Sequence, residues 1–166
     1  MKFPVFPLNG AILFPGTNLP LNIFEEKYIQ MVDFALSNNR LIGMIQTKEN
    51  NEFFKIGCLG KITNFTETQN GGYQINLEGL NRFKYKHILK TDYKFILIEA
   101  ESVNYKRKLN IKNSSLNQKI FSSFKNFLNI KKIKFDTSEF EKLDTLSLAK
   151  IICVISPLDN LVKQML

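Results

Sequence analysis

The sequence predicts an α+β fold: a small, twisted, mostly antiparallel β-barrel with one inserted helix, followed by a small α-helical subdomain. Short apolar or alternating runs separated by tight turns fill residues 1–105, with one stretch of helical period among them. Beyond residue 113 the apolar residues recur at the helical spacing. Because the polar, basic segment 104–113 separates the two patterns, we place the barrel at residues 1–105 and the helical subdomain at residues 106–166.

The stretch 3–24, FPVFPLNGAILFPGTNLPLNIF, contains four of the five prolines and is otherwise mostly apolar. Proline fixes φ and has no N–H to donate, so we expect neither long helices nor central strands here. So much apolar surface on irregular backbone must be buried, and we expect the rest of the N-terminal half to wrap around it. The expected extended pieces are 3–6, 11–14 and 19–24, joined by turns at Asn9-Gly10 and Pro15-Gly16.

A helix is predicted at residues 25–37. Glu25 and Glu26 fall in its first turn, where the helix dipole favours negative charge. Apolar residues recur on one face, and we interpret this stripe as core packing. The stripe consists of Phe24, Tyr28, Met31, Val32, Ala35 and Leu36.

The remaining barrel residues read as strands joined by short turns. Asn70, Gly71 and Gly72 form a strong hairpin signal, because Asn-Gly and Gly-Gly accept positive φ. Gly79 interrupts the alternation that follows and predicts a bulge or a close approach of backbone. The expected strands are 41–46, 56–68, 73–78, 82–90 and 93–103.

Three helices are predicted in the second part of the chain. Ser114 or Ser115 caps the first, which runs to about Leu128, and a short turn is expected at residues 138–142. Asp144 caps the helix 145–155, whose composition is apolar almost all round and suits a fully buried helix. The final helix starts with Ser156 as N-cap and Pro157 at its first position.

Several short motifs occur in a specific order along the barrel residues. They are PLN at 7–9, FPG at 14–16, LPLNIFE at 19–25, GCLGKI at 57–62 and EGLNRF at 78–83. Together they resemble the amino-terminal, substrate-binding domain of Lon proteases. The resemblance implies a PUA-like pseudo-barrel that recruits unfolded or tagged polypeptides.

The catalytic modules of Lon proteases have no counterpart in the sequence. A phosphate-binding loop needs G-x-x-x-x-G-K-[ST], and residues 57–62 have the wrong spacing and lack the hydroxyl. We therefore expect a stand-alone version of the domain, without ATPase or Ser-Lys peptidase, that is not an enzyme and uses no cofactor. Residues 161–166, LVKQML, resemble a family stretch that continues further, so the helical subdomain is expected to be truncated at its C-terminal end.

Candidate catalytic or metal-binding residues are few. His87 is the one histidine, and it lies in an alternating strand, so we expect a sheet-face histidine and no metal site. Glu99 and Glu101 share one strand face and are expected to form surface ion pairs with neighbouring lysines. Cys58 and Cys153 are 95 residues apart with no C-x-x-C, which predicts two reduced thiols.

The leading functional hypothesis is a non-catalytic polypeptide-binding module, acting as an adaptor in protein quality control. Its partner would be unfolded polypeptide or another protein. An unfolded chain offers apolar side chains and free backbone groups, which an apolar groove or an exposed strand edge accepts. The candidate contacts are Phe14, Leu19, Leu21 and Phe24.

The alternative is a PUA-like protein that binds RNA through the basic region 82–134. This region has fourteen basic and three acidic side chains. Against RNA binding, the chain has few arginines, and a general bias towards lysine would produce the same excess. The candidate contacts are Arg82, Lys84, Lys86, Lys131, Lys132 and Lys134.

The cellular setting follows from what the sequence lacks. No signal peptide is recognisable, and the longest apolar run, 148–155, is interrupted by Lys150 and is too short to span a bilayer. We therefore expect a cytoplasmic protein with no membrane partner. The sequence does not determine an oligomeric state.

Overall fold

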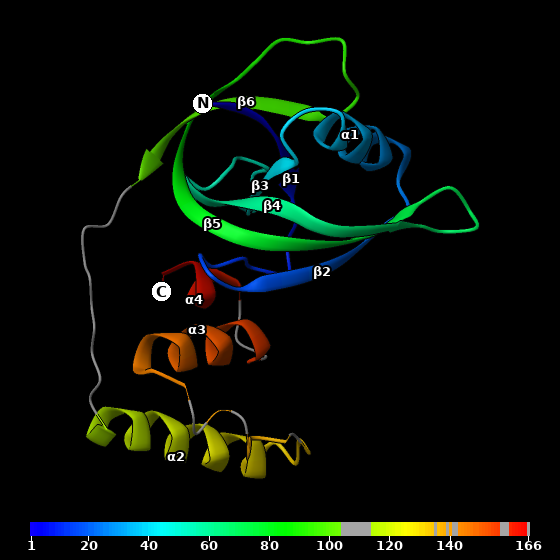
Figure 1. Cartoon of the computed structure of the whole chain (residues 1–166). Coiled ribbons are helices and arrows are strands. Elements are labelled where there is room, and N and C mark those ends of the chain that lie inside the picture. The colour runs from blue at the N-terminus through cyan, green and yellow to red at the C-terminus, as the bar shows by residue number, and fades with distance from the viewer. Residues whose placement is uncertain (104–113, 135, 139, 141–142, 157–159, 166) are drawn as a thin grey trace. The chain divides into compact units, whose positions relative to one another are not determined.

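The computed structural model describes residues 1–103, 114–134, 136–138, 140, 143–156 and 160–165 (Figure 1). The chain forms two compact units, Met1–Tyr105 together with Asp159–Leu166, and Lys106–Leu158. The expected segment 104–113 lies outside the described residues. Among the residues that are described, no helix has the length and apolar character needed to cross a membrane.

The first unit is built on one six-stranded sheet that closes on itself. The strand order is β2-β5-β4-β3-β1-β6, and a further pairing of β5 with β6 closes a barrel. β1 and β3 are parallel, and the other pairs are antiparallel, which confirms the predicted α+β fold with a mostly antiparallel barrel. The strands are β1 (Lys2–Pro7), β2 (Asn18–Ile23), β3 (Leu41–Ile45), β4 (Ile56–Glu67), β5 (Tyr73–Ile88) and β6 (Ile96–Val103).

β5 is the longest strand, and its two halves have different neighbours. Residues 73–78 pair with β2, whereas residues 82–88 pair with β6. The change falls at Gly79, beside a register shift in the β4–β5 ladder between Leu59 and Gly60. The bulge expected at Gly79 is confirmed, and it separates the closed barrel from the part of the sheet that ends at β2.

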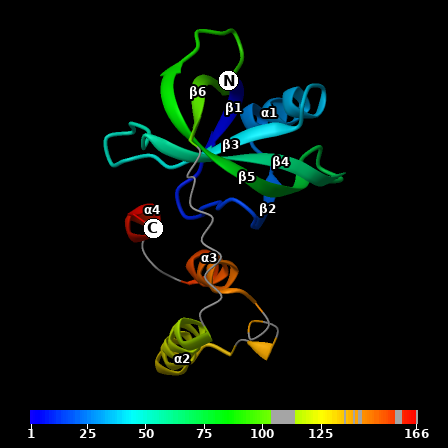
Figure 2. The same ribbon diagram turned by 60° about the vertical axis from the view of Figure 1, so that its left-hand side comes forward.

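The core lies inside the barrel and under the inserted helix α1 (Glu26–Leu36), which packs beside β1 (Figure 2). Met31, Val32 and Ala35 of α1 are buried against the sheet, as the apolar stripe predicts. At the other side of the core, the rings of Phe3 and Phe83 meet edge to face with centroids 5.0 Å apart. Each fully buried aliphatic or aromatic side chain contributes about 1.5–3 kcal/mol of hydrophobic stabilisation.

Proline did not keep β1 out of the interior of the sheet, contrary to expectation. Met1 and Ala100 exchange two backbone hydrogen bonds, of 2.7 and 2.9 Å. Antiparallel ladders alternate, so Pro4, three residues further on, falls at a position without hydrogen bonds to β6. Its missing N–H faces the β3 side, where pairing begins only at Val5. β1 therefore lies between two strands, and no inter-strand hydrogen bond is lost because of Pro4.

Residues 11–14 were expected to be extended, but they form no strand. They belong to the loop between β1 and β2, in which Leu13 and Phe14 are buried. The loop is held by side-chain and backbone hydrogen bonds at Phe14 and Thr17 instead of a ladder. The predicted extended pieces 3–6 and 19–24 correspond to β1 and β2.

The second unit contains α2 (Ser114–Ile130) and α3 (Thr145–Ile155), which pack against each other. Asp144 caps α3 as predicted, because its carboxylate accepts hydrogen bonds from the N–H groups of Leu146 and Ser147. α3 is not fully buried: Thr145 and Leu148 are its buried residues, and Leu146 is exposed. The described helical partner of α3 within this unit is α2. Leu116 of α2 is also exposed.

The last helix, α4 (Asn160–Met165), groups with the barrel, although the sequence placed it in the helical subdomain. The side-chain amide of Gln164 donates a hydrogen bond of 3.2 Å to the carbonyl oxygen of Ile56 at the start of β4. Parts of the predicted turn at 138–142 and of the predicted N-terminus of this helix, at 157–159, lie outside the described residues.

Candidate polypeptide-binding surface

The loop before β2 is fastened to the middle of β5 at Gly79. Gly16, with φ of 79°, donates its N–H to the Gly79 carbonyl at 2.7 Å. Gly79 in turn donates its N–H to the Thr17 carbonyl at 2.8 Å. The Thr17 hydroxyl donates to the Phe14 carbonyl at 2.9 Å and accepts from the Phe14 N–H at 3.2 Å. The FPG and EGLNRF motifs therefore meet in one hydrogen-bonded latch.

The latch determines which backbone groups of β2 face outward. Because Thr17 and Gly79 are hydrogen-bonded, alternation makes Leu19, Leu21 and Ile23 the residues bonded to β5. Asn18, Pro20 and Asn22 then direct their backbone groups away from β5. Figure 1 shows β2 at the rim of the barrel, with β5 on one side and no strand on the other. β2 is therefore an open edge strand in which the proline nitrogen faces outward.

The candidate contacts from the sequence differ in exposure. Phe14 is 6% exposed, because the latch holds its backbone against β5. Its ring is therefore buried and is not available to a partner at this surface. Leu19 and Leu21 are half-buried and pack against the core from the edge of the sheet. Phe24 is 79% exposed. It was expected in the buried stripe of α1, but Ile23 fills the core beside the helix instead.

Phe65 adjoins this surface and was missed by the sequence analysis. It is 42% exposed and lies opposite Ile75 on β5, whose other neighbour is Leu21 on β2. A register shift between Ile62 and Asn64 brings Phe65 onto the same face as these residues. The alternation of apolar and polar residues along 62–67 is interrupted here. This interruption is the sequence signal that could have identified Phe65.

Tyr73 connects the end of β2 to α1. It pairs with Ile23, its ring meets Phe65 edge to face, and its hydroxyl donates to the Asp33 carboxylate at 2.7 Å. The hydrogen bond to Asp33, together with desolvation, raises the pKa of Tyr73 to about 12. This hydrogen bond fixes the β4–β5 hairpin against α1. It therefore also holds Phe65 and Ile75 in place next to β2.

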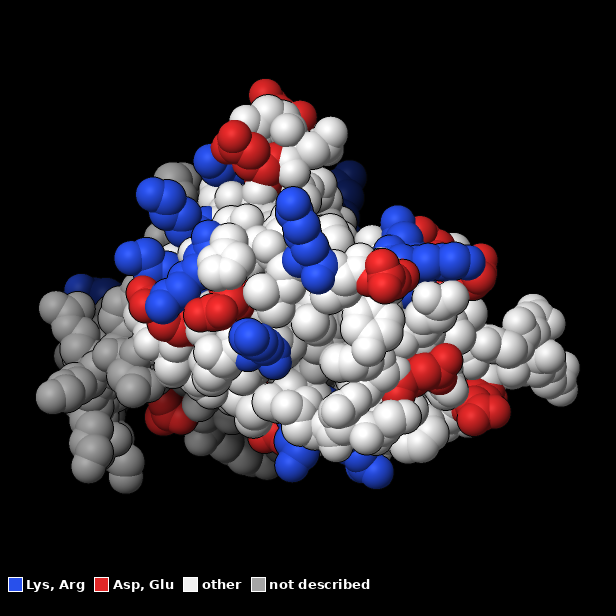
Figure 3. All heavy atoms as spheres, turned by 90° about the horizontal axis from the view of Figure 1, so that it is seen from above, with Lys and Arg blue, Asp and Glu red and all other residues white. Residues whose placement is uncertain are grey.

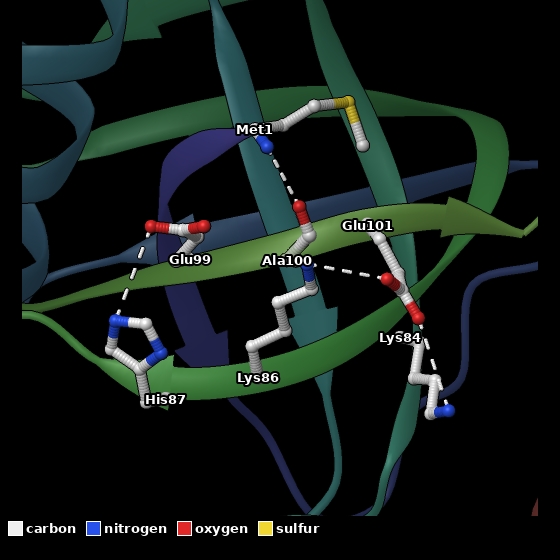
Figure 4. Close-up of polar contacts among 7 residues, drawn as sticks. All are labelled: Met1, Lys84, Lys86, His87, Glu99, Ala100 and Glu101. Carbon is white, nitrogen blue, oxygen red and sulfur yellow. Dashed lines mark hydrogen bonds and ion pairs between the residues drawn. The ribbon is translucent and has the colours of Figure 1, made fainter.

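The basic candidates on β5 lie among carboxylates (Figure 4). Lys84 and Lys86 both approach Glu101, with N–O distances of 3.8 and 3.3 Å, as expected for surface ion pairs. His87 lies on the sheet face, with its Nε2 4.0 Å from Glu99. Exposed pairs of this kind contribute about 0–1 kcal/mol. The carboxylates offset much of the local positive charge.

The other basic candidates are distributed over both units. Arg82 is half-buried on β5, whereas Lys131, Lys132 and Lys134 are exposed beyond α2 in the second unit. On the face seen in Figure 3, blue and red side chains are interspersed among white ones. That face has no continuous basic stripe of the kind that nucleic acid binding uses.

The described side chains form neither a group that could hold a metal ion nor a disulfide. Within the described parts of the chain, no three His, Cys, Asp or Glu side chains are grouped so that they could hold a metal ion. Cys58 is buried, Cys153 is half-buried, and neither takes part in a disulfide. The most distinctive surface of the barrel unit is therefore the open strand β2 with Phe24 at its end.

The family model of the ATP-dependent protease La (LON) substrate-binding domain matches residues 2–166. The chain belongs to this family. The N-terminal domain of a Mycobacterium avium complex Lon protease superimposes with a TM-score of 0.75 at 16% identity, over 99% of this chain and 88% of that one. A Lon N-terminal domain protein from Xanthomonas campestris gives 0.70 at 17% identity, with the same coverage. These solved structures support the fold of a LON substrate-binding domain.

Complete Lon proteases are similar over only part of their length. The Lon protease of Desulfosudis oleivorans is 28% identical over 97 residues, which is 54% of this chain and 12% of that protein. The Lon protease of Buchnera aphidicola from Acyrthosiphon pisum is 24% identical over 139 residues, which is 80% of this chain and 18% of that protein. The LON substrate-binding domain described here thus spans less than a fifth of these relatives.

Proposed function

We propose that this LON substrate-binding domain binds unfolded polypeptide without transforming it. The observation that carries the proposal is the open strand β2, which is followed directly by the exposed ring of Phe24. Unfolded chains differ from folded proteins in offering free backbone groups and apolar side chains together. A strand edge beside an exposed aromatic ring accepts both.

The charge pattern supports a partner of variable sequence. Residues 3–24 contain no charged side chain, so β2 itself does not select a segment by the sign of its charge. Substrates of a quality-control system vary in charge but share apolar segments. We further propose that the protein acts in the cytoplasm as an adaptor that delivers such segments to a partner carrying the catalytic modules.

Binding to carboxymethylated α-lactalbumin, a chain kept unfolded by chemical modification, tests the proposal. Fluorescence anisotropy should show saturable binding at micromolar concentrations. Phe24→Ser should weaken binding about tenfold, since an exposed aromatic anchor contributes about 1–2 kcal/mol. Ile130→Ser is the matched control, because Ile130 is 70% exposed but lies on α2 in the other unit. Absence of binding at about 50 µM, or equal losses in both variants, would refute the proposed function.

RNA binding is the second candidate, favoured by the three exposed lysines 131, 132 and 134 close together beyond α2. Phosphate contacts through lysine give an affinity that falls steeply with salt. Anisotropy with a structured RNA at two salt concentrations tests it. Replacing these three lysines by glutamine should abolish the salt-dependent binding, and an unchanged affinity would remove this candidate.

A further inference from the structure

We propose that polypeptide docks on this domain by strand addition, as an extra β-strand on the outer edge of β2. The inference rests on the proposed function and specifies its mode and substrate class. The segment it would accept is extended and has an apolar side chain at every second position. Each of these features follows from the geometry around β2.

The backbone of β2 has hydrogen-bonding groups left over. By the alternation counted from Thr17 and Gly79, the N–H and C=O groups of Asn18 and Asn22 face outward, together with the C=O of Pro20. No described residue bonds to these groups in the strand pairings or in the loop contacts of the barrel. An extended chain beside β2 would satisfy donors and acceptors on both sides of the proline.

The edge lacks the usual protection against pairing. Natural edge strands are commonly blocked by lysine or by other charges. Residues 3–24 have no charge, and Pro20 is the one blocking element within β2. Opposite Pro20, the partner strand has one carbonyl without a donor. A flexible chain can turn that carbonyl towards water, whereas the rigid edge of a folded protein would leave it unsatisfied.

The side chains of β2 define what the added strand should carry. Leu19 and Leu21 point to the core side and pack on it, yet they are only half-buried because the sheet ends at this strand. Apolar side chains at every second position of an added strand would cover them. Asn18, Pro20 and Asn22 point to the opposite, exposed face, where polar side chains of the partner would lie.

Amide hydrogen exchange, followed by NMR on the unmodified protein, tests the inference without any substitution. In the free protein the amides of Asn18 and Asn22 should exchange fast, while those of Leu19 and Leu21, bonded to β5, should exchange slowly. With saturating carboxymethylated α-lactalbumin, exchange at Asn18 and Asn22 should slow at least about tenfold. The control amides of Leu19 and Leu21 should change much less.

Two synthetic peptides of equal composition test the side-chain pattern. A segment alternating Thr and Val should bind more tightly than one in which three Thr precede three Val, because only the first covers Leu19 and Leu21 from one face. Equal affinities would overturn the alternation preference.

The outcomes separate this inference from the function on which it rests. If the unfolded chain binds but exchange at Asn18 and Asn22 is unchanged, strand addition is refuted and the polypeptide-binding function stands. If it does not bind, the proposed function itself fails. If protection at Asn18 and Asn22 instead increases with protein concentration alone, and the mass doubles in light scattering, the occupant is a second copy of this chain and the inference is overturned.

Discussion

Gly79 and Phe14 are so close that no side chain fits between them. A Cβ built on Gly79 would collide with the carbonyl oxygen of Phe14. The same glycine exchanges backbone hydrogen bonds with Gly16 and Thr17. This contact holds the loop before β2 on the middle of β5, and through the alternation of the ladder it determines which groups of β2 face outward. We therefore expect changes that loosen this contact to weaken the proposed polypeptide binding at the edge as well.

Gly79→Ala should destabilise the protein by about 2 kcal/mol or more, because the obstacle is backbone and cannot move aside. Urea unfolding monitored by circular dichroism measures the effect. Gly71→Ala is the control: Gly71 has a φ of 75° but nothing near its Cβ, so only the backbone cost of about 1 kcal/mol is expected. Equal losses in the two variants would show that the close contact does not exist.

Thr17→Val should cost about 1–3 kcal/mol, because it leaves the buried N–H of Phe14 without its hydroxyl acceptor, whereas the Phe14 carbonyl keeps the N–H of residue 17. The variant keeps the shape of the side chain, so packing changes little. Thr66→Val, on the exposed face of β4, serves as the comparison and should be nearly neutral in the same urea titration. A neutral Thr17→Val would mean that the hydroxyl does not hold the loop.

Tyr73 should titrate with a pKa of about 12, and Asp33→Ala should lower this value towards 10. Ultraviolet absorbance at 295 nm, taken as the difference from Tyr73→Phe, isolates this phenol. Since the folded pKa lies above the unfolded one, the stabilisation is fully present below pH 10 and is lost as pH rises towards 12. An unshifted titration would contradict the bond between Tyr73 and Asp33.

Asp144→Ala should destabilise the second unit by about 1 kcal/mol through loss of the N-cap of α3. Hydrogen bonds from Ser147 and from the N–H of Leu146 lower the pKa of the Asp144 carboxyl. The contribution is therefore present above the unfolded pKa of about 3.9 and is lost as pH falls through the lower folded value. Thermal unfolding at neutral and acid pH measures it, and a difference between wild type and variant that does not shrink in acid would contradict it.

Much of the fold could be predicted from local pattern. The helix at 25–37, the hairpin at Gly71 and Gly72, and the cap at Asp144 each depend on residues close in sequence, so their signals are complete within a short window. The role of Gly79 was also predictable, because a glycine that interrupts an alternating strand usually marks a bulge or a close approach of backbone. The order of motifs was sufficient to predict the family.

The candidate surface was less predictable. Four apolar residues of the first stretch were equal candidates in sequence, yet Phe14 lies in the core and Phe24 is exposed. Prolines interrupt the period there, so no face can be counted from the sequence. Phe65 was missed because a bulge reverses the alternation of β4, and a bulge is defined only against the partner strand.

The residues alone were enough to establish the kind of elements, their order and the uncharged character of the opening stretch. Long-range strand pairing determined which strands are neighbours. Residues 18–23 of β2 pair with residues 73–78 of β5, whereas β5 beyond Gly79 pairs with β6. The reason is physical. Periodicity reports which side of one element is apolar, but an open edge arises only when distant strands have taken their partners and one strand is left with a single neighbour.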